Sequence, residues 1–200
     1  MEQLSLDIKD GVATVTLNRP SNLNSLDHAT KLGLLSVLIH VAQDSQVRAV
    51  VLTGTGRGFC VGQDLNELRA DLQVDADAAW DTVAAHYSPI VRLLSTMPKP
   101  VIAALNGVAA GAGAAFAFAC DFRLAASSAS INLAFATIGL AADSGSTWTL
   151  PKLVGMARAK SLLMRPRSID ASAALTLGLV DEVVEPEELE AETQKLADRL

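Results

Sequence analysis

The segment from Lys99 to Asp121, KPVIAALNGVAAGAGAAFAFACD, decides the fold. Pro100 to Leu105 is a short apolar run that predicts a buried strand. Gly113 to Cys120 is small and apolar and predicts a buried helix, and Asn106-Gly107 and Gly111-Ala112-Gly113 lie between the two. The first amides of such a helix lack carbonyl partners, so its N-terminus predicts a site for negative charge. Close helix–sheet packing explains the same small residues equally well.

Composition limits the classes of protein that remain. The chain has 200 residues, 50% of them hydrophobic, and a net charge of −6, so we expect one domain over residues 1–200 with a sizeable core. There is no basic block, which argues against a nucleic-acid partner. The two cysteines form no disulfide or metal-binding pattern. We find no signal peptide and no unbroken apolar run of spanning length, and therefore expect a cytoplasmic protein without a membrane segment.

The N-terminal third predicts strands and one long helix. Apolar residues alternate with polar ones in residues 4–8 and recur in residues 12–17, on either side of Asp10-Gly11, which predicts an edge hairpin. Asp27 is expected to cap a helix with apolar positions at helical spacing. Residues 48–53, RAVVLT, predict a strand covered on both faces.

A glycine-rich loop follows that strand, from Gly54 to Leu65. It lacks the Gly-Lys-Ser/Thr of a P-loop and the helix-start glycine of a dinucleotide fingerprint. A helical segment is expected to begin at Asp64, and residues 71–78 are polar and expected to be mobile. Apolar residues recur at helical spacing over residues 80–97, and Pro98 ends that helix.

Beyond the central segment the chain continues to alternate. We expect strands at residues 122–125, 130–133 and 179–184, and helices at residues 147–153, 157–164 and 171–177, with an acidic helix from Pro186 to Leu200. Strands and helices in this order favour right-handed crossovers and a largely parallel sheet. The predicted fold class is therefore α/β.

Taken together, the motifs resemble the enoyl-CoA hydratase/isomerase (crotonase) superfamily, and the ring-opening isomerases of the phenylacetate pathway most closely. The motifs, in chain order, are Leu17-Asn18-Arg19-Pro20 with Asn24-Ser25-Leu26, Phe59 to Leu65, Pro100 to Gly107 with Gly111 to Gly113 and Cys120-Asp121, then Ile138 to Leu140, Asp143 to Gly145 and Leu150 to Gly155. Their order and spacing match the family over nearly the whole chain.

The resemblance implies a spiral of β-β-α units with a mainly parallel sheet flanked by helices. Crotonases usually continue for two more helices, so the C-terminal helices are expected to be truncated at Leu200. The resemblance also implies a homotrimer or hexamer. Independently, the apolar segments 109–119 and 147–164 offer more hydrophobic surface than one small sheet can cover, which favours a partner surface.

The ligand that the resemblance implies is an acyl-CoA thioester, with coenzyme A as part of the substrate, no permanently bound cofactor and no metal. Its carbonyl would lie between two backbone N–H groups, assigned by position to Val61 and Ala112, where the family usually has alanine and glycine. Such donors stabilise the enolate formed when an α-proton leaves. The further residues expected to contact the ligand are Asn24, Ser25, Cys60, Gly62, Gln63, Asp64, Leu65, Gly111 and Phe135.

The resemblance also identifies the acid/base groups. The two glutamates of the family's hydratases align with Ala115 and Phe135, and neither residue can carry a proton. Asp143 aligns with an aspartate of the phenylacetate-pathway isomerases and of some dehalogenases, although Ala142 replaces the usual preceding proline. We therefore predict an isomerase that shifts a double bond with Asp143 as base and then acid. Asp143 could also cap the helix that begins near Gly145.

Three other functions remain open. A hydratase is disfavoured by the missing glutamates. A hydrolase or dehalogenase would use Asp143 as a nucleophile and needs a water activator, but His28, His40 and His86 lie in no pocket motif. A non-catalytic acyl-CoA-binding protein of this fold would explain Ala115 and Phe135.

Overall fold

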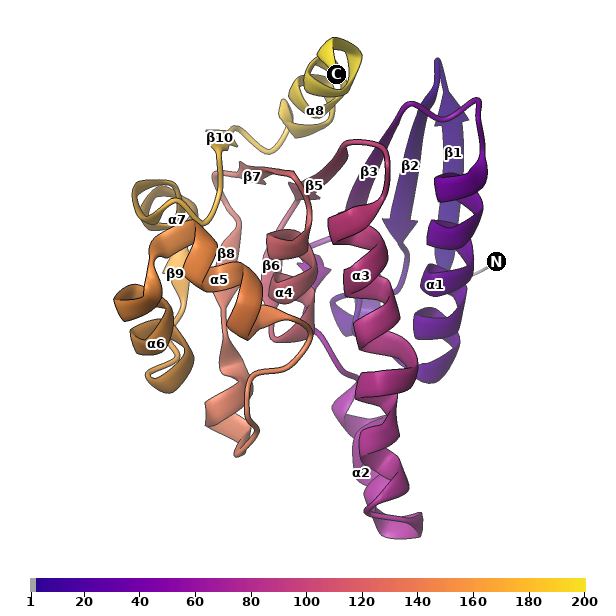
Figure 1. The fold of residues 1–200 in the computed structure, drawn as a ribbon. Coiled ribbons are helices and arrows are strands. Elements are labelled where there is room, and N and C mark those ends of the chain that lie inside the picture. Colours follow the sequence, from indigo (N-terminus) through magenta and orange to yellow (C-terminus); the bar gives the residue numbers. More distant parts are fainter. Residues whose placement is uncertain (1–2) are drawn as a thin grey trace.

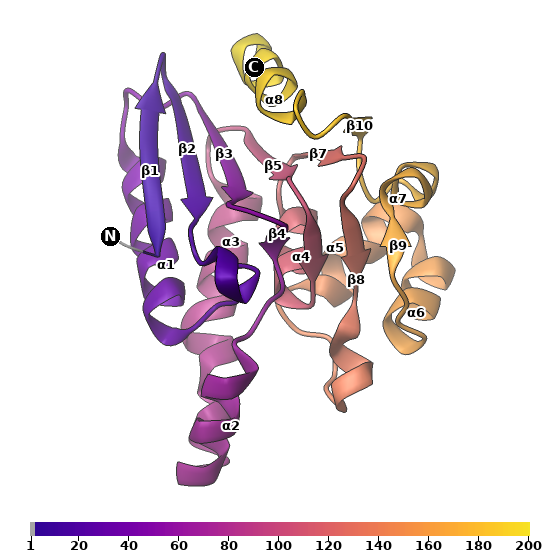
Figure 2. The ribbon, with the colours of Figure 1, turned by 180° about the vertical axis from the view of Figure 1, so that it is seen from behind.

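The computed structural model describes residues 3–200 and contains two β-sheets (Figures 1 and 2). The first two residues of the predicted domain lie outside this description. The larger sheet has the order β1-β2-β3-β5-β7-β10, formed by Leu4–Lys9, Val12–Leu17, Ala49–Gly54, Val101–Leu105, Phe122–Ala126 and Glu182–Val184. The smaller sheet has the order β4-β6-β8-β9, formed by Gly58–Cys60, Val108–Ala110, Ser130–Asn132 and Ile169–Asp170.

The chain visits the two sheets alternately. In β3-β4, β5-β6 and β7-β8 the first strand joins the larger sheet and the second joins the smaller one. Neighbouring strands are parallel except in the pairs β1–β2 and β8–β9. This confirms the predicted α/β spiral of β-β-α units. Of the smaller sheet, the sequence predicted only β8, as residues 130–133; β4, β6 and β9 were missed because strands of two or three residues are too short for a period-2 pattern.

Helices cover the sheets. They are α1 (His28–Gln43), α2 (Leu65–Val74), α3 (Ser88–Thr96), α4 (Ala112–Ala119), α5 (Ser146–Val154), α6 (Met156–Met164), α7 (Ala171–Leu177) and α8 (Leu189–Arg199). In Figure 1, α1, α3 and α4 lie side by side in front of the larger sheet, and α3 contacts both of the others. The last helix, α8, packs against β3, β5 and β7. No helix of the described chain is both long and apolar enough to cross a membrane.

Three predicted boundaries were wrong. Residues 71–74 belong to α2, where we expected a polar loop, because the Asp64 cap and the buried Leu68 stabilise this helix. Leu179 and Val180 are buried but precede β10, which begins only at Glu182. The acidic helix begins at Leu189, after a turn in which the Glu188 amide donates to the Glu185 carbonyl.

Backbone contacts explain the small residues at the centre. A Cβ atom on Gly113 would lie 2.1 Å from the carbonyl oxygen of Cys60, so only glycine lets α4 approach β4 this closely. A Cβ on Gly62 would lie 3.0 Å from both the Ala110 oxygen and the Ala112 nitrogen. Close packing of α4 against β4, and of Gly62 against the residues around the start of α4, is thus one reason for these glycines. All eight residues of α4 are buried within the chain, so the prediction that this segment needs a partner surface was wrong.

Candidate active site

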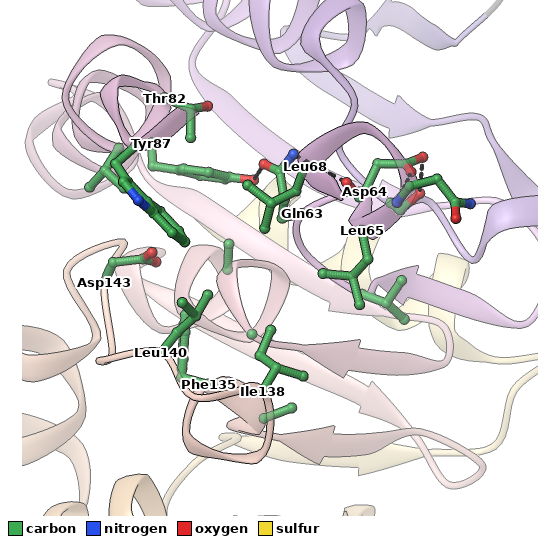
Figure 3. A pocket seen from close by; sticks show the side chains of 18 of the residues that line it. Gln63, Asp64, Leu65, Leu68, Thr82, Tyr87, Phe135, Ile138, Leu140 and Asp143 are labelled. Carbon is green, nitrogen blue, oxygen red and sulfur yellow. Dashed lines mark hydrogen bonds between the residues drawn. The ribbon is translucent and has the colours of Figure 1, made fainter. Parts of the chain in front are cut away.

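A cavity of about 360 Å³ opens where the loop after β4, the segment before α3 and the start of α4 meet. Figure 3 shows Asp143 at one end of it and Asp64 and Leu65 at the other, with Phe135, Ile138 and Leu140 along one wall. The complete lining is Asn22, Ser25, Val61, Gln63, Asp64, Leu65, Asn66, Leu68, Trp80, Thr82, Val83, Tyr87, Gly111, Ala112, Ala134, Phe135, Ile138, Leu140 and Asp143. Most of these side chains are apolar, as is common in sites for organic ligands.

Among residues 3–200, two of the backbone amides at the cavity that have no acceptor lie on adjoining segments. One belongs to Ala112, the first residue of α4, and is orphaned because helix starts leave such donors unpaired. The other belongs to Gln63. A parallel bridge, in which the Leu26 amide donates to the Gly62 carbonyl at 2.8 Å and the Asp64 amide donates to the Leu26 carbonyl at 3.1 Å, leaves the Gln63 amide between them without an acceptor.

The assignment of Val61 as a donor was wrong. Its amide donates to the carbonyl of Leu23 at 3.2 Å, so this hydrogen is already used inside the protein. Gln63 is the residue after Gly62, where an added Cβ would lie only 3.0 Å from the Ala112 nitrogen. The free amides of Gln63 and Ala112 therefore lie on adjoining segments at the same cavity. In this loop the Val61 amide is paired, whereas the Gln63 amide has no acceptor among residues 3–200.

Asp143 is the carboxylate best suited to carry a proton. Its side chain accepts a hydrogen bond from the Ser144 hydroxyl at 2.8 Å. Burial raises the pKa of Asp143 above its ordinary value of 3.8, and the Ser144 bond opposes this only partly. The side chain does not cap α5: Gly145 is the cap residue, and the Ser146 amide donates to the main-chain carbonyl of Asp143. The capping alternative is thereby removed.

Asp64 has a structural role. It caps α2 by accepting from the amides of Asn66 and Glu67, and it accepts from the hydroxyl of Ser25 at 3.0 Å and the guanidinium of Arg19 at 3.1 Å. Burial alone would raise the pKa of Asp64, but these hydrogen bonds and the Arg19 charge lower it below the ordinary value. Asp64 therefore stays ionised and is a poor proton donor.

The remaining predicted ligand contacts divide into two groups. Ser25, Leu65, Gly111 and Phe135 line the cavity as expected. Asn24, Cys60 and Gly62 do not, because they are buried beneath the loop with 1% or less of the Asn24 and Cys60 surfaces exposed. Asn24 instead ties loops together through the carbonyls of Thr55 and Gly58.

Ala115 is fully buried, and none of the three histidines, all within the described chain, lines the cavity. Tyr87 does line it, which the sequence did not indicate. Burial, assisted by nearby anionic groups that include Asp143, raises the pKa of its phenol, so Tyr87 acts as a hydrogen-bond donor. Within residues 3–200 there is no cluster of three or more side chains arranged to hold a metal ion.

Comparison with known proteins agrees with this fold. The family model for enoyl-CoA hydratase/isomerase matches residues 7–200, and the chain belongs to that family. It is similar to the 1,2-epoxyphenylacetyl-CoA isomerase of Escherichia coli K12, with 43% identity over 200 residues that cover all of this chain and 76% of the relative. The predicted resemblance to the phenylacetate-pathway isomerases is thus confirmed.

Two crystal structures show the same fold. A Mycobacterium abscessus protein aligns with a TM-score of 0.95 at 40% identity, covering 98% of this chain and 76% of that one. The enoyl-CoA hydratase of Bacillus anthracis aligns with a TM-score of 0.90 at 36% identity, covering 98% and 76% of the two chains. The chain thus spans about three quarters of the length of these relatives.

Proposed function

We propose that this protein is an acyl-CoA isomerase that shifts a double bond through a thioester enolate. The observation that carries the proposal is that, of the two carboxylates among the described residues that line the cavity, Asp143 is the one not tied to a cation or a helix cap. Asp64 is committed to Arg19 and to the cap of α2. The positions that align with the hydratase glutamates hold Ala115 and Phe135.

In the proposed reaction, the thioester oxygen accepts hydrogen bonds from the amides of Gln63 and Ala112. Two fixed donors stabilise the enolate more than the neutral carbonyl, so they lower the barrier to loss of the α-proton. Asp143 removes that proton and returns it to the carbon at the far end of the shifted double bond. A raised carboxyl pKa suits both steps, since it makes the carboxylate a stronger base and leaves its conjugate acid able to give the proton back.

The substrate is proposed to be a CoA thioester with an apolar acyl group, because most of the lining side chains are apolar and include leucine, isoleucine, phenylalanine and tryptophan. The name of the Escherichia coli relative adds an aryl-derived acyl group to the compounds that we would test.

The test is proton exchange and isomerisation with 3-enoyl-CoA thioesters in D2O, followed by mass spectrometry. We expect the wild type to convert 3-enoyl to 2-enoyl thioesters and to incorporate deuterium, and Asp143→Asn to lose both activities by at least about 100-fold. Unchanged activity in Asp143→Asn contradicts the assigned base. A 3-hydroxyacyl product identifies a hydratase instead, and tight binding without exchange or turnover identifies a binding protein.

A further inference from the structure

Lys31 of α1 is a buried cation next to the proposed site, and the proposed reaction does not use it. Only 2% of its surface is exposed. Its ammonium group donates to the Thr82 hydroxyl at 2.9 Å, to the Gln63 side-chain oxygen at 3.1 Å and to the Glu67 carboxylate at 3.3 Å. All three N–H bonds are therefore used. A charge this deeply buried is costly to keep, and Glu67 offsets only part of that cost.

These contacts join the segments that surround the cavity. Gln63 belongs to the loop after β4, Glu67 to α2, and Thr82 to the segment that leads to Tyr87. Gln63 and Thr82 themselves line the cavity, whereas Lys31 reaches them from behind. Lys31 is thus the point at which α1 holds both sides of the pocket wall together.

The Gln63 side chain is fixed from every direction. Its oxygen accepts from Lys31 and also from the Tyr87 hydroxyl at 2.6 Å, a bond drawn in Figure 3. Its side-chain nitrogen, Nε2, donates to the main-chain carbonyl of Asp64 at 3.3 Å and to the Glu67 carboxylate at 3.4 Å. Both the oxygen and the nitrogen of the side-chain carboxamide are therefore hydrogen-bonded. These bonds fix the side-chain torsions of Gln63 and, because the side chain joins the backbone at Cα, they also restrain the orientation of its main-chain amide.

We propose that Lys31 is a positioning residue for the main-chain amide of Gln63. Together with Tyr87 it clamps the Gln63 side chain, so that the unpaired N–H of that residue stays directed into the cavity beside the Ala112 amide. The inference rests on the proposed function in one respect: these two amides are taken to receive the thioester oxygen. Lys31 touches no reacting atom, so its effect appears only through Gln63.

The test uses two unreactive CoA analogues that differ at one group. In the first, methylene replaces the thioester sulfur and the carbonyl is kept; in the second, methylene replaces the carbonyl and the sulfur is kept. We expect the wild type to bind the carbonyl analogue more tightly by calorimetry. Lys31→Met should reduce that preference roughly tenfold, with little change for the analogue that lacks the carbonyl, because misdirecting a donor harms only the group it serves.

Three further variants keep the experiment decisive. In Lys31→Met the Glu67 carboxylate loses its cation, so the double variant Lys31→Met with Glu67→Gln removes that unpaired charge as well. It should show the same loss of preference for the carbonyl analogue. Tyr87→Phe, which leaves α1 intact, removes the other donor to the same oxygen and should reduce the preference in the same direction if Lys31→Met does not fold. The control is Lys99→Met, which removes a partly buried lysine that bonds the carbonyls of Val41 and Asp44, away from the loop.

The outcomes separate the two proposals. If folded Lys31→Met keeps the wild-type preference for the carbonyl analogue, the positioning role is wrong while the amide pair stands. If the wild type shows no preference, the amide pair itself is wrong and the positioning role falls with it. If Lys99→Met loses as much preference for the carbonyl analogue as Lys31→Met does, the effect comes from general destabilisation. That result also overturns the positioning role of Lys31.

Discussion

The hydroxyl of Tyr87 donates to the side-chain oxygen of Gln63 across 2.6 Å, which links the segment before α3 to the loop after β4. Tyr87 is 2% exposed, and its ring lies 6.0 Å from that of Phe116 in α4. Tyr87 therefore joins three parts of the pocket. It belongs to the segment before α3, its ring packs on α4, and its hydroxyl reaches the loop after β4. Neither group can shift without affecting the other.

The first prediction concerns this bond. Tyr87→Phe should lower the free energy of unfolding by about 1 kcal/mol, since Lys31 still satisfies the Gln63 oxygen. It should also lower kcat about tenfold and weaken substrate binding, because the Gln63 main-chain amide serves the neutral thioester carbonyl and, more strongly, the charged oxygen of the transition state. Urea denaturation and steady-state kinetics measure the two effects. A rise in KM at constant kcat would contradict this role.

The second prediction is a dependence on pH. Because Asp143 must be ionised to act as base, kcat/KM should rise with pH through its folded-state pKa, which lies above 3.8. In Asp143→Asn that limb of the profile should disappear together with most of the activity. A pH profile of the wild type and variant checks this.

The third prediction concerns stability at the same residue. A raised pKa means that the folded state binds the Asp143 proton more tightly than the unfolded state does, so stability falls as pH rises from 3.8 through the folded pKa. Asp143→Asn cannot lose that proton. We therefore expect a higher Tm than wild type above this window and a smaller difference below it. Equal Tm values at neutral pH would contradict the buried, desolvated environment.

The fourth prediction concerns Asp64. Asp64→Ala removes a helix cap and partly buried bonds to Ser25 and Arg19, and should cost about 2 kcal/mol at neutral pH. Because its folded pKa is lowered, this contribution is complete above 3.8 and is lost as pH falls through the folded value. Asp170→Ala is the control. It removes the exposed cap of α7 and should cost less.

The fifth prediction concerns assembly. We expect an oligomer, a trimer or hexamer by family resemblance, because Trp148, Met156 and Met164 on α5 and α6 are 57%, 58% and 75% exposed. Light scattering at micromolar concentration should give a multiple of 20.9 kDa, and Trp148→Ser with Met164→Ser should shift it toward one chain. A monodisperse wild-type monomer contradicts the prediction.

The sequence predicted most elements because their signals are local. The strand Val101–Leu105 and the capped helix α1 followed directly from composition and spacing. Asp143 was found through a motif, and the structure adds the burial that raises its pKa. Such features depend on a few neighbouring residues or on a family pattern.

What could not be predicted depends on contacts between distant segments. Val61 and Gln63 are two positions apart in one motif, and only the hydrogen bond from Val61 to Leu23 shows which amide is unpaired. No local pattern pointed to Lys31, since its partners lie 32, 36 and 51 positions away. Tyr87 lies within residues 80–97, where the sequence shows only apolar residues at helical spacing, and that spacing reveals no partner for its hydroxyl.

The contact between Gly113 and Cys60 has a consequence for how this protein could change. Since a Cβ at Gly113 would lie 2.1 Å from the carbonyl oxygen of Cys60, the distance between α4 and β4 is set by main chain against main chain. The side chains of Phe135 and Asp143 line the cavity and take no part in that main-chain contact. New reactions could therefore be selected or engineered on the same backbone by exchanging only proton carriers, whereas mutation of the glycines removes the shared starting point for all of them.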